Sequence, residues 1–138
     1  MTPAVTAYPE VFTVTTKLYH KDVYAPDVIF RSPGVVRLRY SRHAQYAACD
    51  DRYGDLSRYL TPYMDFDEAE IVEVELDVEG QISKRVARFQ VDEDLVLVVV
   101  AQTDGFVRTV WGNLISDRHS TLDRRKYVQP PRRVLVCA

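Results

Sequence analysis

His43 is the residue whose chemical type and position most directly suggest catalysis. It stands in the segment Ser41-Arg42-His43-Ala44, at the expected start of a helix. The positive end of a helix dipole disfavours an imidazolium cation, so an imidazole placed there can accept a proton near neutral pH. The competing interpretation is a surface histidine that makes only a structural hydrogen bond, which is the commoner use of a single histidine.

Arg85 and Arg108 are the candidate anion ligands. The strand pattern around Arg85 places it opposite Leu76 on an otherwise apolar face, where an unpaired guanidinium is costly to bury. Arg85 therefore needs an acidic partner or a bound anion such as phosphate, unless it reaches solvent at a strand end. Arg108 lies in the later run Phe106–Trp111, where strand alternation places it on the same face as Val110.

The segment from Asp117 to Tyr127 gathers further groups that could transfer protons. His119 could donate or accept a proton, and Tyr127 could donate a hydrogen bond. Loops on a rigid scaffold often carry function, which favours a functional interpretation. A solvated terminal loop with caps and salt bridges has the same composition, so both interpretations stay open.

A short helix that follows a strand is expected to position the histidine. The run Val35–Tyr40 predicts the strand, and Ser41 is suited to cap the helix because its hydroxyl can accept a backbone N–H of the first turn. The helix is expected from residue 42 to residue 50 or 51, before the break at Tyr53-Gly54. A second short helix is expected over Leu56–Leu60.

A strand hairpin is the clearest signal in the second half of the chain. Valine and leucine alternate with acidic residues over Glu70–Glu79, which predicts a strand with one buried face. Gly80-Gln81 fits a type II′ turn into the next strand. This turn places opposite charges across from one another, Asp77 with Lys84 and Glu73 with Arg88.

Two more strands complete the predicted fold. The apolar run Leu95–Val100 predicts a central strand that is covered on both faces, and Phe106–Trp111 is expected to return beside it with Trp111 in the core. The pattern predicts an α+β fold with one or two N-terminal helices packed on a four- to six-stranded, mainly antiparallel sheet. The 138 residues fit one domain, with a strand and loop extension over residues 1–34 and a basic loop or tail over residues 112–138.

Composition narrows the classes of function. The net charge of −2 argues against non-specific nucleic-acid binding by the whole surface, although residues 106–138 hold seven basic against two acidic residues. Cys49 and Cys137 are expected as reduced thiols, and no spacing suits a zinc site, so neither metal nor cofactor is expected. Without a signal peptide or a membrane-spanning run, we expect a soluble cytoplasmic protein, in the cytoplasm of the bacterial host if a phage encodes it.

The order of these segments resembles small RelE/BrnT-type ribonuclease-toxin domains over residues 37–111. The resemblance rests on Ser41–Ala44, Lys84–Val86, Leu97–Val100 and Arg108–Trp111. It implies metal-independent RNA cleavage, in which the 2′-hydroxyl attacks the adjacent phosphorus with help from an acid, a base and cations. The roles that it implies are His43 as base or acid, His119 or Tyr127 as the opposite proton-transfer residue, and Arg85 and Arg108 as phosphate contacts. The chain departs from such toxins in being acidic overall and in carrying extra terminal segments.

Residues 117–127 also resemble segments of uncharacterised proteins from tailed phages of actinobacteria. Three functions therefore stay open: a ribonuclease-like toxin acting on host RNA, a non-catalytic phage or bacterial protein that binds and inhibits a host protein, and a small virion or assembly component. The second would use an edge strand or the acidic hairpin. The first requires His43, Arg85 and Arg108 to share one pocket with His119 or Tyr127.

Overall fold

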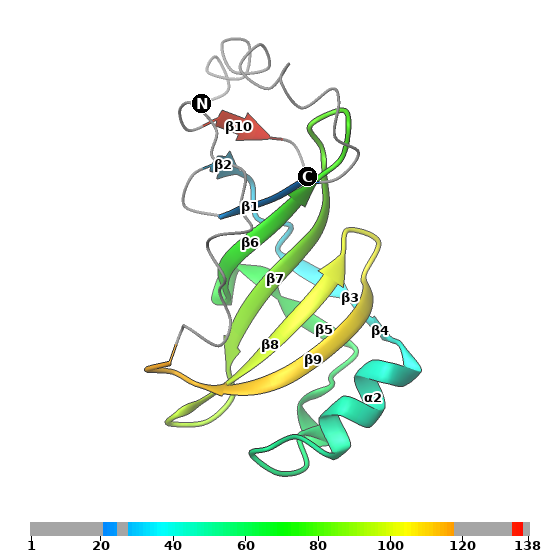
Figure 1. Ribbon diagram of the computed structural model, residues 1–138, viewed down its shortest axis with the longest axis vertical. Coiled ribbons are helices and arrows are strands. Elements are labelled where there is room, and N and C mark those ends of the chain that lie inside the picture. The colour runs from blue at the N-terminus through cyan, green and yellow to red at the C-terminus, as the bar shows by residue number, and fades with distance from the viewer. Residues whose placement is uncertain (1–20, 25–27, 118–133, 137–138) are drawn as a thin grey trace.

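The fold is that of an α+β protein with a helix packed on a mainly antiparallel sheet, as predicted (Figure 1). A computed structural model describes residues 21–24, 28–117 and 134–136. No helix within these ranges is long and apolar enough to cross a lipid bilayer. The candidate residues His119 and Tyr127 lie outside the described residues, as do residues 1–20 of the N-terminal extension.

The main sheet has six strands in the order β1-β6-β7-β8-β9-β4. Every neighbouring pair is antiparallel except β4 and β9, which run parallel. The four strands from β6 to β9 form the predicted meander. The strands are β1 (Lys21–Tyr24), β4 (Arg39–Tyr40), β6 (Glu70–Leu76), β7 (Ile82–Gln90), β8 (Leu95–Gln102) and β9 (Phe106–Leu114).

A second layer packs on one face of this sheet. It contains the helix α2 (Arg42–Cys49) and the antiparallel pair of β3 (Val35–Arg37) and β5 (Tyr63–Asp65). Two 3-10 turns, η3 (Ser57–Tyr59) and η4 (Phe66–Glu68), flank β5, and η3 stands where a second helix was expected. A separate parallel pair joins β2 (Val28–Phe30) to β10 (Val134–Val136).

The expected single strand Val35–Tyr40 is divided at Leu38. The amide of Leu38 donates to the carbonyl of Pro62 at 2.7 Å, whereas the amide of Arg39 donates to the carbonyl of Gly105 at 2.9 Å. The backbone therefore changes hydrogen-bonding partners between two consecutive residues. This change carries the chain from the small sheet to the edge of the main sheet.

The predicted type II′ turn is wrong. The loop has three residues, Val78–Gly80, and Gly80 adopts a positive φ of 78° at its last position. The carboxylate of Asp77 fixes this geometry because it accepts the amides of Glu79 and Gln81 at 2.9 and 3.0 Å. Opposite charges still face each other, but in the pairs Glu75 with Lys84 and Glu70 with Arg88.

The new register also moves Arg85. The three-residue turn, together with a bulge between Leu76 and Glu75, places Arg85 opposite Val74, where Leu76 had been expected. The face remains apolar, so the original question about an isolated guanidinium persists.

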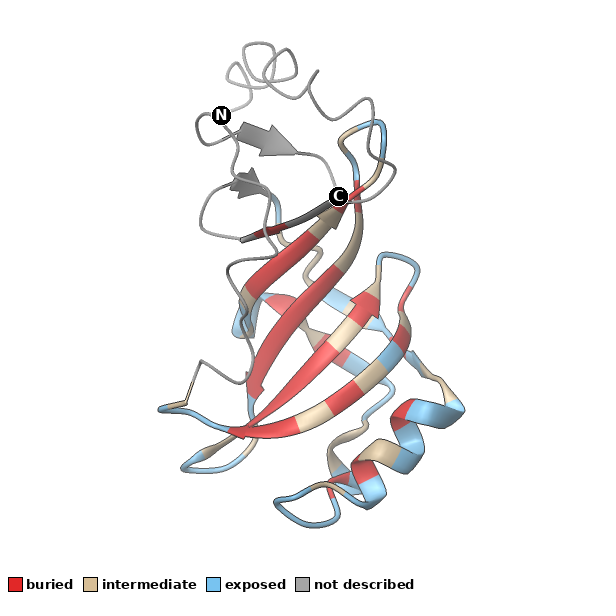
Figure 2. Cartoon of the chain, in the orientation of Figure 1, coloured by how far each residue is buried: buried red, intermediate tan, exposed pale blue. Residues whose placement is uncertain are grey.

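The core lies mainly between the sheet and the second layer. It combines the α2 residues Ala44 and Ala48 with Phe66 and with sheet residues such as Leu97 and Val99. The other face carries a smaller cluster of Val72, Val86, Val96 and Val98, against which Val100 and Trp111 pack. Strand β8 is therefore buried on both faces, as predicted (Figure 2).

Strand β9 continues to Leu114, three residues beyond its expected end at Trp111. The amide of Gly112 donates to Asp51 Oδ1 at 2.9 Å, and a Cβ at this position would lie 2.7 Å from Asp51 Oδ2. Glycine thus allows the loop after α2 to approach the strand edge closely. Residues 112–114 belong to the sheet and not to the tail.

Candidate anion-binding edge

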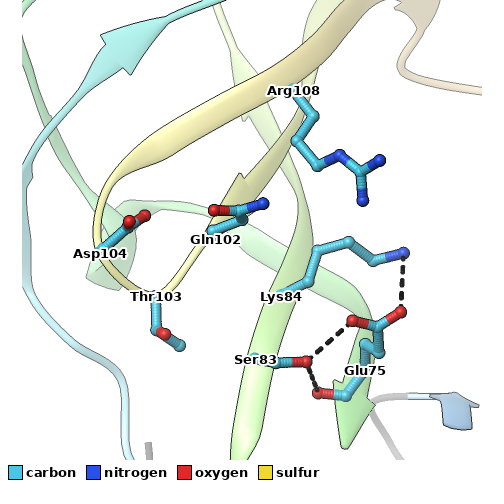
Figure 3. A pocket seen from close by; sticks show the side chains of 7 residues that line it. All are labelled: Glu75, Ser83, Lys84, Gln102, Thr103, Asp104 and Arg108. Atoms are coloured by element: carbon cyan, nitrogen blue, oxygen red, sulfur yellow. Dashed lines mark hydrogen bonds and ion pairs between the residues drawn. The ribbon is translucent and has the colours of Figure 1, made fainter. Parts of the chain in front are cut away.

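A polar hollow of about 450 Å³ opens at the end of the sheet where β7, β8 and β9 meet (Figure 3). It lies beside the turn between β8 and β9, on the sheet face opposite α2. Its charged side chains come from three different strands and the turn. The lining residues are Glu75, Ser83, Lys84, Gln102, Thr103, Asp104 and Arg108.

The acidic side chains beside the hollow are already engaged by Lys84. Its Nζ lies 3.7 Å from Glu73 Oε2 and 3.8 Å from Glu75 Oε2. Ser83 Oγ donates to Glu75 Oε1 at 2.8 Å. Glu73 is also only 2% exposed, so this part of the acidic hairpin is poorly suited to contact a basic partner.

Arg108 is the cation of the hollow that remains open to a ligand. Its side chain is exposed and extends toward Lys84 (Figure 3), and no ion pair engages it among the described residues. A bulge opposite Val100 and Ala101 inserts Arg108 into β9 as an extra residue. Arg108 therefore faces away from the core residue Val110, and the expectation that the two share a face is wrong.

His43 is exposed in the first turn of α2, and the residue that caps this helix is hydrogen-bonded to the start of β9. Ser41 caps α2 as predicted, with its Oγ accepting the amide of Ala44 at 2.9 Å. The same hydroxyl donates to the carbonyl of Arg108 at 2.8 Å, and the Ser41 amide donates to the carbonyl of Val107 at 3.0 Å. The histidine and Arg108 thus come from adjacent elements, although His43 does not line the hollow.

Arg85 does not join this site. It is buried on the face of the sheet that carries α2 and the main core, paired with Ala101 on β8. Lys84 and Arg108 belong to the opposite face. Arg85 and Arg108 therefore do not share one hollow, and the expected single pocket does not include both arginines.

Three arginines that the sequence analysis did not single out accompany Arg108. Arg37 and Arg39 lie on β3 and β4, and Arg42 opens α2; all three are exposed. Arg39 pairs with Phe106, two residues before Arg108, and opens onto the same sheet face. We call the set Arg37, Arg39, Arg42 and Arg108 the arginine edge.

Little negative charge opposes the arginine edge within the described part of the chain. Asp104 forms one ion pair with Arg39 at 3.4 Å, and both side chains are exposed to water. Solvent screening makes such a pair weak, so Arg39 can exchange Asp104 for another anion.

Aromatic rings lie close to these arginines. The Arg39 guanidinium is 5.5 Å from the centre of the Phe106 ring, and Arg37 pairs with Tyr63, which is 57% exposed. Tyr46, on α2, is 71% exposed. Exposed rings beside cations are the two components that contact the bases and the phosphates of a single strand.

Tyr40, between Arg39 and Arg42 in the sequence, packs against the main core and has a structural hydrogen bond. Its hydroxyl donates to the carbonyl of Thr61 at 2.6 Å. Burial raises the pKa of Tyr40 to about 12, and the hydrogen bond opposes part of that increase. Tyr40 therefore stays protonated at neutral pH and cannot serve there as a general base.

The described residues contain no group of three or more histidine, cysteine or carboxylate side chains that could hold a metal ion. Comparison of the chain with protein-family models, with curated proteins and with solved structures identifies no match. The functional argument consequently depends on the geometry of the chain itself.

Proposed function

We propose that the chain binds single-stranded RNA along the arginine edge. The observation that carries this proposal is that four exposed arginines lie on neighbouring elements, β3, β4, the start of α2 and β9, in a chain whose net charge is −2. Phosphate contacts supply most of the affinity of sequence-independent RNA binding. A local basic strip on an acidic protein supports binding of one strand at a defined place, without general adhesion to nucleic acid.

The neighbouring groups suit the other parts of a nucleotide. Ser41 accepts the amides of Ala44 and Gln45, so the amides of Arg42 and His43 are the ones at the start of α2 that a phosphate oxygen could contact. Phe106 and Tyr63 offer ring faces for stacked bases, which is the usual way in which unpaired RNA bases are held. Arg108 extends over the hollow, where a phosphate could reach it without displacing an existing ion pair.

A second candidate function, metal-independent cleavage, rests on the RelE/BrnT resemblance alone, because the expected pocket that unites His43, Arg85 and Arg108 is not formed. In this candidate His43 is a proton-transfer residue and Arg108, without Arg85, contacts the phosphate. In that reaction the 2′-oxygen loses its proton to a base and attacks phosphorus, while the departing 5′-oxygen gains a proton from an acid. The products are a 2′,3′-cyclic phosphate and a free 5′-hydroxyl. The position of His43 directly after Arg42 at the start of α2 supports this role, because cations would stabilise the negative charge that develops on the phosphorane.

Binding is tested with a fluorescently labelled, unstructured RNA and anisotropy titration of the full chain. Arg42→Glu and Arg108→Glu are each expected to weaken binding at least tenfold, since each replaces an attraction with a repulsion. Arg58→Glu is the matched control, because Arg58 is exposed on η3 and stacks on Tyr59 away from the edge. Equal affinity of the edge variants and the control would disprove RNA binding at the arginine edge.

Cleavage is tested separately in the presence of EDTA. We expect His43→Ala to abolish the appearance of cyclic-phosphate ends while RNA binding and the circular dichroism spectrum are retained. Wild-type protein that binds RNA without cutting it would remove the ribonuclease role and leave RNA binding as the function. Cutting that persists in His43→Ala would remove His43 from the reaction.

A further inference from the structure

Arg85 occupies the middle of an apolar row that crosses the main sheet. Its neighbours across the two adjacent strands are Val74 on β6 and Ala101 on β8. The row continues to Val23 on β1 and to Val107 on β9. These four neighbours are between 0 and 3% exposed, and Arg85 itself is 4% exposed. A guanidinium here has lost nearly all of its contact with water.

The unsatisfied atoms form one complete side of the guanidinium. Nε and Nη2 are both buried and have no hydrogen-bond partner. These two nitrogens point in the same direction from the planar group, and together they bind two oxygens of one carboxylate or phosphate. Burial lowers the pKa of Arg85, and within the described ranges of the chain no carboxylate opposes this effect.

Arg88, three residues later on β7, shows that this fold can satisfy a buried arginine. Its guanidinium donates to the carbonyl oxygens of Leu114, Ile115 and Asp117 at 3.0 to 3.3 Å. Its Nε also lies 3.5 Å from Glu70. Arg88 needs nothing further, whereas Arg85 has neither carbonyls nor a carboxylate, and leaving a buried charge in this state costs several kcal/mol.

We propose that Arg85 is an anion-binding residue, whose Nε and Nη2 bind two oxygens of a carboxylate or phosphate group on a small ligand. This site is separate from the arginine edge, because Arg85 and Arg108 lie on opposite faces of the sheet. The shared chemistry is a two-oxygen anion. A phosphate ester and a carboxylic acid are its two sources.

The proposal is tested by thermal unfolding of the full chain in chloride, acetate and inorganic phosphate at equal ionic strength. Wild-type protein is expected to gain several degrees in Tm in one or both oxyanions relative to chloride, because a ligand that binds only the folded state stabilises it. The oxyanion that acts at the lower concentration identifies the source. Arg108→Glu must keep this gain, which separates the result from binding at the arginine edge.

Two substitutions at the same position complete the test. Arg85→Met removes the charge while keeping most of the side-chain volume, so it should abolish the gain and should leave Tm in chloride unchanged or higher. Arg85→Lys keeps the charge without the paired nitrogens and should lose most of the gain. If Arg85→Met unfolds or lowers Tm while wild-type protein ignores both oxyanions, Arg85 is paired within the chain and the proposal fails.

Discussion

Arg85 and Arg88 are both buried on β7, but their guanidinium groups have different surroundings. Arg88 fastens the end of β9, because its N–H groups donate to the carbonyls of Leu114, Ile115 and Asp117 at and just beyond the last residue of the strand. Arg85 has the same degree of burial and no such partners. Burial alone therefore does not distinguish a structural arginine from a ligand-binding one, and the hydrogen-bond partners do.

We expect Arg88→Met to destabilise the protein by about 1–3 kcal/mol, because it removes three hydrogen bonds from a buried guanidinium to the end of β9. Urea unfolding followed by circular dichroism measures the change. Arg85→Met in the same buffer is the matched control and should cost far less. Similar losses for the two variants would mean that both arginines are structural.

Sequence reasoning identified Arg85 for a sound reason and His43 and Arg108 for a partly sound one. An arginine at an inward position of an alternating strand is unusual in any register. The expectation of a guanidinium on an apolar face therefore held, although the residue opposite Arg85 is Val74 and not Leu76. The meeting of the α2 start with β9 could not be predicted in the same way. It depends on the parallel pairing of β4 with β9, which joins residues more than sixty positions apart and leaves no local pattern.

At the scale of elements, the helix, the meander and the buried central strand were predictable because each rests on a repeating pattern of side chains. The type of the turn after β6 could not be predicted in this way, because it depends on the hydrogen bonds of a single carboxylate. Asp77 accepts two amides inside the loop and thereby selects a three-residue turn over the two-residue turn that Gly80 alone suggests. The division of the strand at Leu38 likewise depends on a distant acceptor, the carbonyl of Pro62.

Ser41 links the stability of α2 to the geometry of the arginine edge. Its hydroxyl both caps the helix and bonds to the Arg108 carbonyl. We expect Ser41→Ala to lower the free energy of unfolding by about 1 kcal/mol, as for other lost N-caps. RNA affinity should fall as well, since the start of α2 and the backbone at Arg108 lose one of the hydrogen bonds that join them.

Ser41→Thr keeps the hydroxyl and should restore most of both properties. Urea unfolding and anisotropy on the same preparations give the two values. If Ser41→Ala is destabilised but binds RNA with unchanged affinity, the cap stabilises the helix without organising a binding site.

At the scale of the whole molecule, the distribution of charge matters more than its sum. The net charge is −2, yet the four arginines lie on connected elements, while Glu73 and Glu75 both lie within ion-pair distance of Lys84. An RNA strand that approaches the arginine edge therefore meets local attraction. The size of the edge limits the number of phosphates that it can contact.

The limit predicts how RNA binding depends on salt. If the arginine edge contacts about four phosphates, the logarithm of the association constant should fall with the logarithm of salt concentration at a slope of about −3, since single strands give about −0.7 per phosphate. Arg108→Gln should make the slope shallower by about 0.7, and Arg58→Gln should leave it unchanged. Anisotropy titrations at several concentrations of potassium chloride measure these slopes. A wild-type slope near zero would exclude phosphate contacts as the source of affinity, and a slope that Arg108→Gln does not alter would place them elsewhere on the protein.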